Sequence, residues 1–202
     1  GKPETMRRAE FLNVFAATYP VWLREDERIV GSQRFCGPPW DQILSQEQLE
    51  TCGRHGNLGH IVVDYGRVLR LGISGLREAV EQMPESDNKG AFALTLDAFA
   101  TFVGRHGFKA LIVRPPESFH EALQLTWFTQ IFLRAEGNAS AVSFGRLDQF
   151  LWPFLDQDVR LGRCTEADAF ELICCFFMKC CEGSESQNLT VGGNGQENPL
   201  SL

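Results

Sequence analysis

Residues 143–156 read SFGRLDQFLWPFLD, and the composition of this stretch limits how the whole chain can fold. Aromatic rings, a glycine and a proline stand beside one arginine and two carboxylates, a mixture too apolar for a surface loop and too polar for a plain core helix. An unpaired charge carried into a core costs several kcal/mol or more. We therefore expect Arg146 and Asp148 to have partners. The simplest interpretation is an internal ion pair that fixes how a loop enters a helix, with a functional site as the alternative.

The composition of the 202-residue chain is that of a globular protein with a substantial core. Hydrophobic residues make up 44% and charged residues 22%, and 16 Phe against 2 Tyr suggest rings used for filling. The net charge of −7 argues against a nucleic-acid surface, which needs clustered Lys and Arg. The sequence shows neither a membrane-length apolar run nor a signal-peptide pattern, so we expect no membrane contact and a cytoplasmic location.

Seven cysteines, four of them in CCFFMKCC at 174–181, do not resemble a disulfide framework, because neighbours on one helix point apart. Cys174 and Cys181 lie about two turns apart on one predicted helical face, which leaves a metal site as an alternative. However, the sequence has no CxxC pair, and its four histidines are not spaced for zinc. We predict that these thiols fill the core and that no metal is bound.

Apolar periodicity and capping residues predict that most of the chain is helical. Asp64 and the pairs Ser118/Glu121 and Thr165/Asp168 are suited to cap helix N-termini. Residues 188–191, NLTV, form the single convincing strand, and glycine-rich sequence follows it. The predicted helices span 4–18, 21–25, 46–52, 64–84, 91–105, 119–136 and 165–183.

Two features of the predicted helices bear on function. Gly72 and Gly75 lie inside a helical pattern, where glycine costs about 1 kcal/mol relative to alanine, so we expect another backbone to approach that face. Asp97 lies in the next helix, whose apolar positions run nearly all the way round. A carboxylate in such company needs a structural partner or a ligand, and desolvation would raise its pKa.

Several stretches, taken in order, resemble the amino-terminal half of the pyruvate formate-lyase-like glycyl radical enzymes, which include choline trimethylamine-lyase and the B12-independent glycerol dehydratase. The resemblance covers nearly the whole chain. Each motif is weak alone, and their shared order carries the inference. The stretches are WLRE at 22–25, ERIVG at 27–31, GH at 59–60, DY at 64–65, DA at 97–98, FVGR at 102–105, FHEALQ at 119–124, WF at 127–128, residues 143–153, NLTVGG at 188–193, EN at 197–198 and LSL at 200–202.

The resemblance implies a catalytic barrel of two opposed five-stranded halves wrapped by helices. Within it, a thiyl radical on a cysteine loop would cleave a C–C, C–N or C–O bond of a small-molecule substrate under anaerobic conditions. The radical would be stored on a glycine and installed by a separate activase that uses S-adenosylmethionine and an iron–sulfur cluster. No cofactor is expected to be bound to this chain itself. Such chemistry needs a closed, dry cavity, because an exposed radical is quenched.

The sequence differs from the family pattern in the loops that carry the radical chemistry. It contains neither the Gly-Cys-x-Glu loop of the radical cysteine nor the Arg-Val-x-Gly-Tyr-type loop of the radical glycine. The link from Arg105 to Pro115 is also far shorter than the family's, which predicts an internal deletion. Residues 1–202 are therefore expected to form a partial pyruvate formate-lyase-like domain. This domain would be mainly α with a few β strands, comprising the helical amino-terminal part and first strands of a ten-stranded α/β barrel.

Three residues are assigned to the substrate by this resemblance. Asp97 falls where relatives place a residue that touches the substrate, and Asn188 and Thr190 lie on the presumed barrel strand. Lys89 stands where some relatives have a tyrosine, so the substrate itself cannot be transferred, while Arg146 and Asp148 are assigned a structural role.

The predicted function is that of a truncated lyase or dehydratase that is inactive alone, with the activase as a partner and a homodimer as one assembly. The alternative is a non-catalytic helical binding module, or a fragment that completes another subunit's site.

Overall fold

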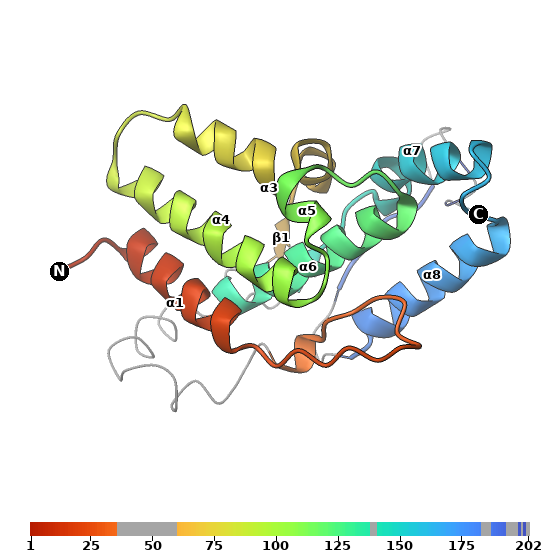
Figure 1. The fold of residues 1–202 in the computed structure, drawn as a ribbon, viewed down its shortest axis with the longest axis horizontal. Helices are drawn as coiled ribbons and strands as arrows, with labels where there is room; N and C mark the ends of the chain where they lie inside the picture. Colours follow the sequence, from red (N-terminus) through yellow and green to blue (C-terminus); the bar gives the residue numbers. More distant parts are fainter. Residues whose placement is uncertain (36–59, 138–140, 183–186, 193–197, 199, 201–202) are drawn as a thin grey trace.

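The computed structural model describes residues 1–202 apart from 36–59, 138–140, 183–186, 193–197, 199 and 201–202. The described part is mainly helical with two short strands, as predicted. Helix α6 lies in the middle and contacts α1 and α3 on one side and α7 and α8 on the other (Figure 1). The elements are α1 (Glu4–Thr18), the 3-10 turn η1 (Gln33–Phe35), β1 (His60–Val62), α3 (Tyr65–Glu81), α4 (Asp87–Arg105), α5 (Ala110–Val113), α6 (Phe119–Gly137), β2 (Ala141–Ser143), α7 (Leu147–Arg160) and α8 (Glu166–Cys180).

Helix α6 is enclosed on all sides, which confirms the prediction from its apolar sequence. Its side chains from Ala122 to Ile131 are buried. Polar groups on it hold an extended segment: the Gln124 amide accepts from Val30 N and donates to Val30 O, both at 2.9 Å. Trp127 Nε1 donates to Gly31 O at 3.1 Å. Two of the stretches that carry the family resemblance therefore contact each other in the fold.

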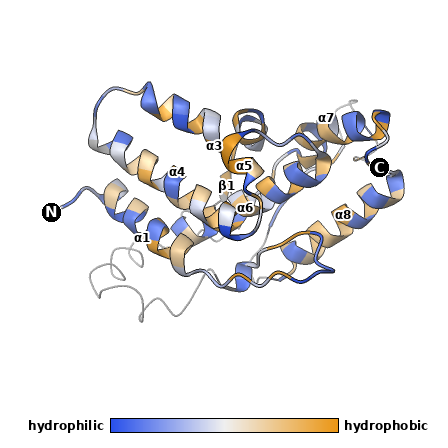
Figure 2. Ribbon diagram, viewed as in Figure 1, coloured by the Kyte–Doolittle hydropathy of each residue, from blue (hydrophilic) through white to orange (hydrophobic). Residues whose placement is uncertain are grey.

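Aromatic rings fill the core between α1, α4 and α6. Phe102 of α4 lies 5.8 Å from Phe15 of α1 and 5.5 Å from Phe128 of α6, measured between ring centroids. Ring pairs at such distances contribute about 0.5–1.5 kcal/mol beyond the burial of their area. Hydrophilic and hydrophobic residues alternate along the helices, α6 included (Figure 2), and the apolar residues of α6 from Ala122 to Ile131 are buried. The expectation that phenylalanine is used for filling is confirmed.

The sheet differs from the prediction. Strands β1 and β2 pair in parallel, with Ile61 opposite Val142. The predicted strand at 188–191 is reduced to an isolated parallel bridge between Leu189 and Gly145, so its assignment as the one strand is wrong. Three-residue strands are too short to show a reliable alternating pattern in the sequence, which explains why both were missed.

Several helix boundaries also differ from the prediction. Residues 21–25 do not form a helix; Trp22 is 72% exposed, and Arg24 pairs with Asp26 instead. Most helical stability comes from tertiary packing of an apolar face, and the exposed Trp22 shows that this segment has no such packing. Helix α4 begins at Asp87, four residues before the predicted start, where the Ser86 side chain caps it, and the short helix α5 was not predicted. The predicted helix at 46–52 lies outside the described residues.

The predicted caps are largely present. Asp64 accepts from Arg67 N, and Thr165 and Asp168 form a complete capping box. The Ser118 hydroxyl accepts from Glu121 N at 3.2 Å, as predicted. The Glu121 carboxylate, however, accepts from Glu117 N at 2.8 Å and from the Arg114 guanidinium. This ion pair lowers the pKa of Glu121 against the opposing effect of burial.

Helix α3 is broken into two arms at Gly72, whose φ is 62° and ψ −175°. A Cβ atom at this position would lie 2.9 Å from the Cα atom of Pro115, so the predicted close approach of another backbone is confirmed here. At Gly75 the prediction is wrong, because the nearest atoms are those of the Leu71 side chain. The positive φ and the close contact together require glycine at position 72.

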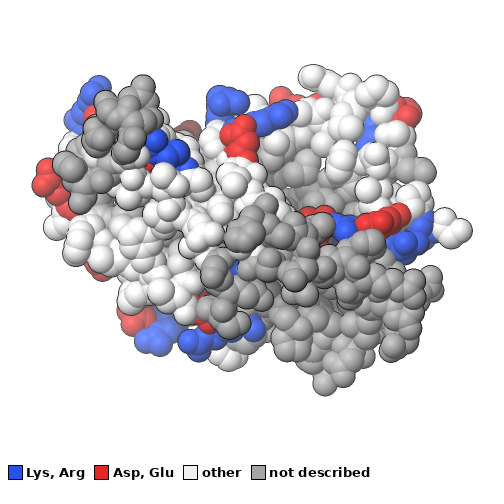
Figure 3. Space-filling view, turned by 180° about the vertical axis from the view of Figure 1, so that it is seen from behind, with Lys and Arg blue, Asp and Glu red and all other residues white. Residues whose placement is uncertain are grey.

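The surface shows mixed charges. On the face seen in Figure 3, basic and acidic side chains lie beside each other around the edges, and they do not gather into one basic patch. No described helix combines the length and apolar character needed to cross a membrane.

Candidate functional site

Asp97 lies on the surface of α4, which overturns the expectation of apolar surroundings. Its side chain is 64% exposed and pairs with Arg77 of α3, which is 35% exposed. The apolar positions of α4 are not buried all the way round: Ala98, Phe99 and Phe102 are buried, whereas Phe92 and Ala93, in the turns before Asp97, are exposed. The carboxylate therefore has an ionic partner and access to solvent.

Asn188 and Thr190 lie beside the short sheet. Phe144 N donates to Asn188 O, and Thr190 N donates to Gly145 O, both at 2.8 Å. Both predicted residues are exposed. Within the described part of the chain, no hydrogen bond or ion pair connects either residue to Asp97. The structure thus places two of the three predicted residues together, on a backbone bridge, and the third on α4.

The Asp148 carboxylate organises the start of α7. Its side chain is fully buried and receives the Arg146 guanidinium on both oxygens, at 2.9 and 2.8 Å. Its Oδ2 also accepts from Gln149 Nε2 at 3.0 Å and from Gly192 N at 3.1 Å. Asn198 donates to the Asp148 carbonyl at 3.2 Å. The predicted internal ion pair is confirmed, and it holds the segment that follows Asn188 and Thr190 against α7.

A buried polar network that was not predicted lies behind the sheet. The Tyr65 hydroxyl donates to Gln130 Oε1, and Gln130 Nε2 donates to Val142 O at 3.0 Å and to Gln187 Oε1 at 3.2 Å. Burial raises the pKa of Tyr65, so the hydroxyl stays protonated and acts as a donor. The signal that could have found this network is a glutamine between Phe128 and Ile131 on the apolar side of the helix, because a buried amide needs hydrogen-bond partners.

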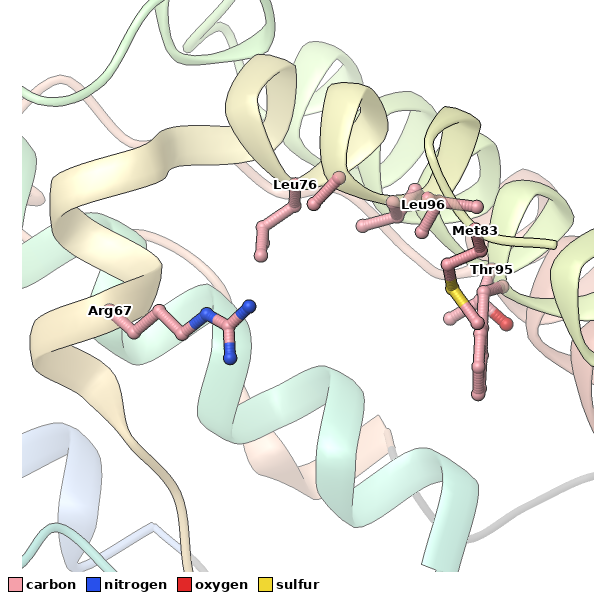
Figure 4. A pocket seen from close by; sticks show the side chains of 8 residues that line it. Arg67, Leu76, Met83, Thr95 and Leu96 are labelled. Atoms are coloured by element: carbon pink, nitrogen blue, oxygen red, sulfur yellow. The ribbon is translucent and has the colours of Figure 1, made fainter.

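An apolar groove of about 360 Å³ lies on the outer side of α3 and α4. Figure 4 shows the second arm of α3 with Leu76 and Met83 along one wall, Thr95 and Leu96 of α4 nearby, and Arg67 reaching in from the first arm. The break at Gly72 separates the two arms and so sets Arg67 apart from the apolar wall. Sequence analysis did not identify this groove. The full lining is Arg67, Leu76, Ala79, Val80, Met83, Phe92, Thr95 and Leu96.

The cysteines of α8 mostly fill space. Cys175 and Cys180 pack against the core, Cys174 is partly buried and Cys181 is exposed. Burial raises the pKa of Cys180 to about 12, so its thiol stays protonated near neutral pH. Among the described residues, no group of three or more His, Cys, Asp or Glu is placed to hold a metal ion.

Comparison with known proteins shows which proteins this chain is similar to. The Pyruvate formate lyase-like family model matches residues 106–197. The isethionate sulfite-lyase of Nitratidesulfovibrio vulgaris is 31% identical over 156 residues, covering 58% of this chain and 19% of that protein.

Two solved structures share the fold over the entire chain. The glycerol-bound B12-independent glycerol dehydratase from Clostridium butyricum matches with a TM-score of 0.78 at 21% identity, covering 100% of this chain and 40% of its own. A glycyl radical enzyme from Archaeoglobus fulgidus matches with a TM-score of 0.75 at 18% identity, covering 100% of this chain and 41% of its own. The chain thus spans about a fifth of that curated relative and two fifths of these structures. The chain is therefore similar to one part of the pyruvate formate lyase-like proteins, and it shares the fold of the corresponding part of these glycyl radical enzymes.

Proposed function

We propose that this chain provides the helical amino-terminal part and the first strands of a glycyl radical enzyme of the lyase or dehydratase type. The observation that carries the proposal is the family match over residues 106–197, which includes α6, β2, α7 and α8. The complete enzyme would cleave a C–C, C–N or C–O bond of a small organic molecule through a radical. A separate activase would install that radical on a glycine. The cytoplasmic location and a homodimer stay predictions.

Within this proposal, the 202-residue polypeptide cannot turn over substrate by itself. Radical chemistry of this family needs a cysteine and a glycine in specific loops, and the sequence of this chain contains neither loop. The role of the chain is then to form one wall of the enzyme. The Asp148 cluster supports this role, because it fixes the segment after the Leu189 bridge from within the chain.

Asp97, Asn188 and Thr190 are proposed to contact substrate in the complete enzyme. Their exposure supports the proposal, because a side chain that meets a ligand must not be covered by its own helices. The Asp97 carboxylate pairs with Arg77 and is accessible, so Asp97 would accept a hydrogen bond from a hydroxyl or ammonium group of the substrate.

Anaerobic activation tests the proposal. The purified chain is incubated with S-adenosylmethionine and a reduced iron–sulfur activase of this family, and electron paramagnetic resonance is recorded. We expect no glycyl radical signal from the 202-residue chain, and a signal from a family member that carries both loops under the same conditions. A glycyl radical on this chain alone would overturn the proposal that it is catalytically incomplete.

A second candidate, a non-catalytic binding module, is favoured by the apolar groove on α3 and α4. Size-exclusion chromatography and thermal unfolding separate the two candidates. A monomer that unfolds cooperatively is expected for a module, whereas aggregation is expected for an isolated wall of a barrel with uncovered strand edges.

A further inference from the structure

We propose that the α3–α4 groove binds an amphipathic helix that carries a carboxylate facing Arg67. The helix is assigned to the portion of a glycyl radical enzyme polypeptide that this chain does not match. The source of the helix rests on the proposed function, whereas the chemistry of the groove does not.

The residues that line the groove have a helical period on both of its walls. Leu76, Val80 and Met83 follow one another at intervals of four and three residues on α3, and Phe92 and Leu96 are four residues apart on α4. Two neighbouring helices that both present apolar stripes to one outer side form the usual seat for a third helix. Phe92 is 43% exposed, so its ring is only partly covered by α3 and α4. The groove thus has the geometry of helix-in-groove recognition.

Arg67 gives the groove a charge preference. Among the described residues, no group accepts a hydrogen bond from its guanidinium and no carboxylate lies within ion-pair distance. By contrast, Arg77, Arg114 and Arg146 each pair with a carboxylate. Figure 4 shows the Arg67 side chain extending toward the space that the apolar residues border. A carboxylate on the incoming helix would form an ion pair with the Arg67 guanidinium through a charge-assisted hydrogen bond.

The comparisons indicate where such a helix comes from. The solved neighbours contain the whole fold of this chain within 40% and 41% of their length. In a complete enzyme of this kind, the remaining 60% or so must pack somewhere on this wall. An exposed apolar groove beside Arg67, which pairs with no carboxylate in the described part of the chain, is a surface that such packing would cover.

A peptide series tests the chemistry first. The probe is a fluorescent synthetic helix of about fourteen residues, or four turns, with a leucine stripe and one glutamate at its edge. Binding is followed by fluorescence anisotropy. We expect the glutamate peptide to bind about tenfold more tightly than its glutamine counterpart, and Arg67→Glu to abolish that preference. Arg70→Glu, which changes an exposed arginine of the same arm outside the groove, is the matched control and should keep it.

A substitution on the apolar wall of the groove tests whether the apolar contacts are needed for binding. Val80→Asp should abolish binding of both peptides, while circular dichroism shows that the helices remain folded. Equal binding of the glutamate and glutamine peptides, or no binding of either, would overturn the proposal. Self-association in sedimentation equilibrium that Val80→Asp abolishes would also overturn it, because a second copy would then be the occupant.

Tiled peptides then test the source. Peptides that cover the unmatched portion of a solved neighbour are screened, and a binder with an apolar stripe and an acidic residue is expected. If only unrelated helices bind, the assigned source is wrong. No radical takes part in these measurements, so a failure here is independent of the paramagnetic resonance test of the proposed function.

Discussion

Two aspartate–arginine pairs, Asp148–Arg146 and Asp97–Arg77, occupy opposite environments in this fold. The Asp148 side chain is fully buried and also accepts hydrogen bonds from Gln149 and from the backbone of Gly192. The Asp97 side chain is 64% exposed and pairs across the surface between two helices. The same chemical pair therefore fixes the structure in one region and leaves an accessible carboxylate in the other. Burial, rather than residue type, decides which role is possible.

The comparison predicts its largest effect at Asp148. Asp148→Asn should lower the free energy of unfolding by about 3 kcal/mol, because it removes the buried negative charge that pairs with Arg146 and weakens the hydrogen bond from Gly192 N. Asp97→Asn should change it by at most about 0.5 kcal/mol, since exposed pairs contribute little. Urea unfolding followed by tryptophan fluorescence measures both. Similar losses for the two variants would show that burial does not separate the pairs.

The second prediction concerns the break in α3, which sets the arm that carries Arg77. Gly72→Ala should destabilise the fold by about 2 kcal/mol, because alanine disfavours the positive φ and its Cβ would meet the Pro115 backbone. Gly75→Ala is the matched control in the same helix and should stay within about 1 kcal/mol of the native chain. Thermal unfolding measures the pair. An unchanged melting temperature for Gly72→Ala would show that the break is not required.

The smallest predicted effect is a pH dependence of the free energy of unfolding. It is caused by His106, the residue that follows the C-terminus of α4, the helix that carries Asp97. His106 is buried beside Phe102 and Tyr19, its Nδ1 forms a hydrogen bond with Phe102 O at 2.7 Å, and its Nε2 has no hydrogen-bond partner among the described residues. Burial lowers the pKa of His106, with Arg105 acting in the same direction and Glu27 in the opposite one. Protonation therefore favours the unfolded state, so stability is full above the unfolded pKa near 6.5 and declines as the pH falls below it.

The expected decline between about pH 7.5 and about pH 5.5 is close to 1 kcal/mol. Urea unfolding at the two pH values measures it. His106→Phe, whose ring can occupy the same aromatic cluster, should remove most of the decline. A native chain that is equally stable at both values would rule out a neutral buried His106 as its cause.

The sequence predicted those parts of the fold that depend on local chemistry. Helix periodicity located α1, α3, α6 and α8, and the capping residues Asp64 and Thr165 fixed two of their starts. The partners of Arg146 and Asp148 were also predicted, because a charge among aromatic residues has few alternatives to pairing. The aligned motifs led to the family that the comparisons support.

The sequence could not predict which face of a helix the tertiary packing would leave open. Asp97 was expected among apolar residues because α4 is apolar on several sides, yet α1, α3 and α6 cover only part of it. The groove beside it requires two helices and the break at Gly72, which no single periodic pattern contains. The strands β1 and β2 were missed for a similar reason, since three residues acquire strand character only through their partner.

The sequence by itself determined the helical class, the family resemblance and the need for an internal partner at Asp148, because local propensity and the cost of a buried charge act wherever the residues lie. Only the tertiary structure decided which carboxylates are exposed, where the two strands meet and that an apolar groove lies beside an arginine with no ion-pair partner among the described residues. These properties depend on contacts between residues far apart in the chain, such as Gly72 with Pro115 and Asp148 with Gly192.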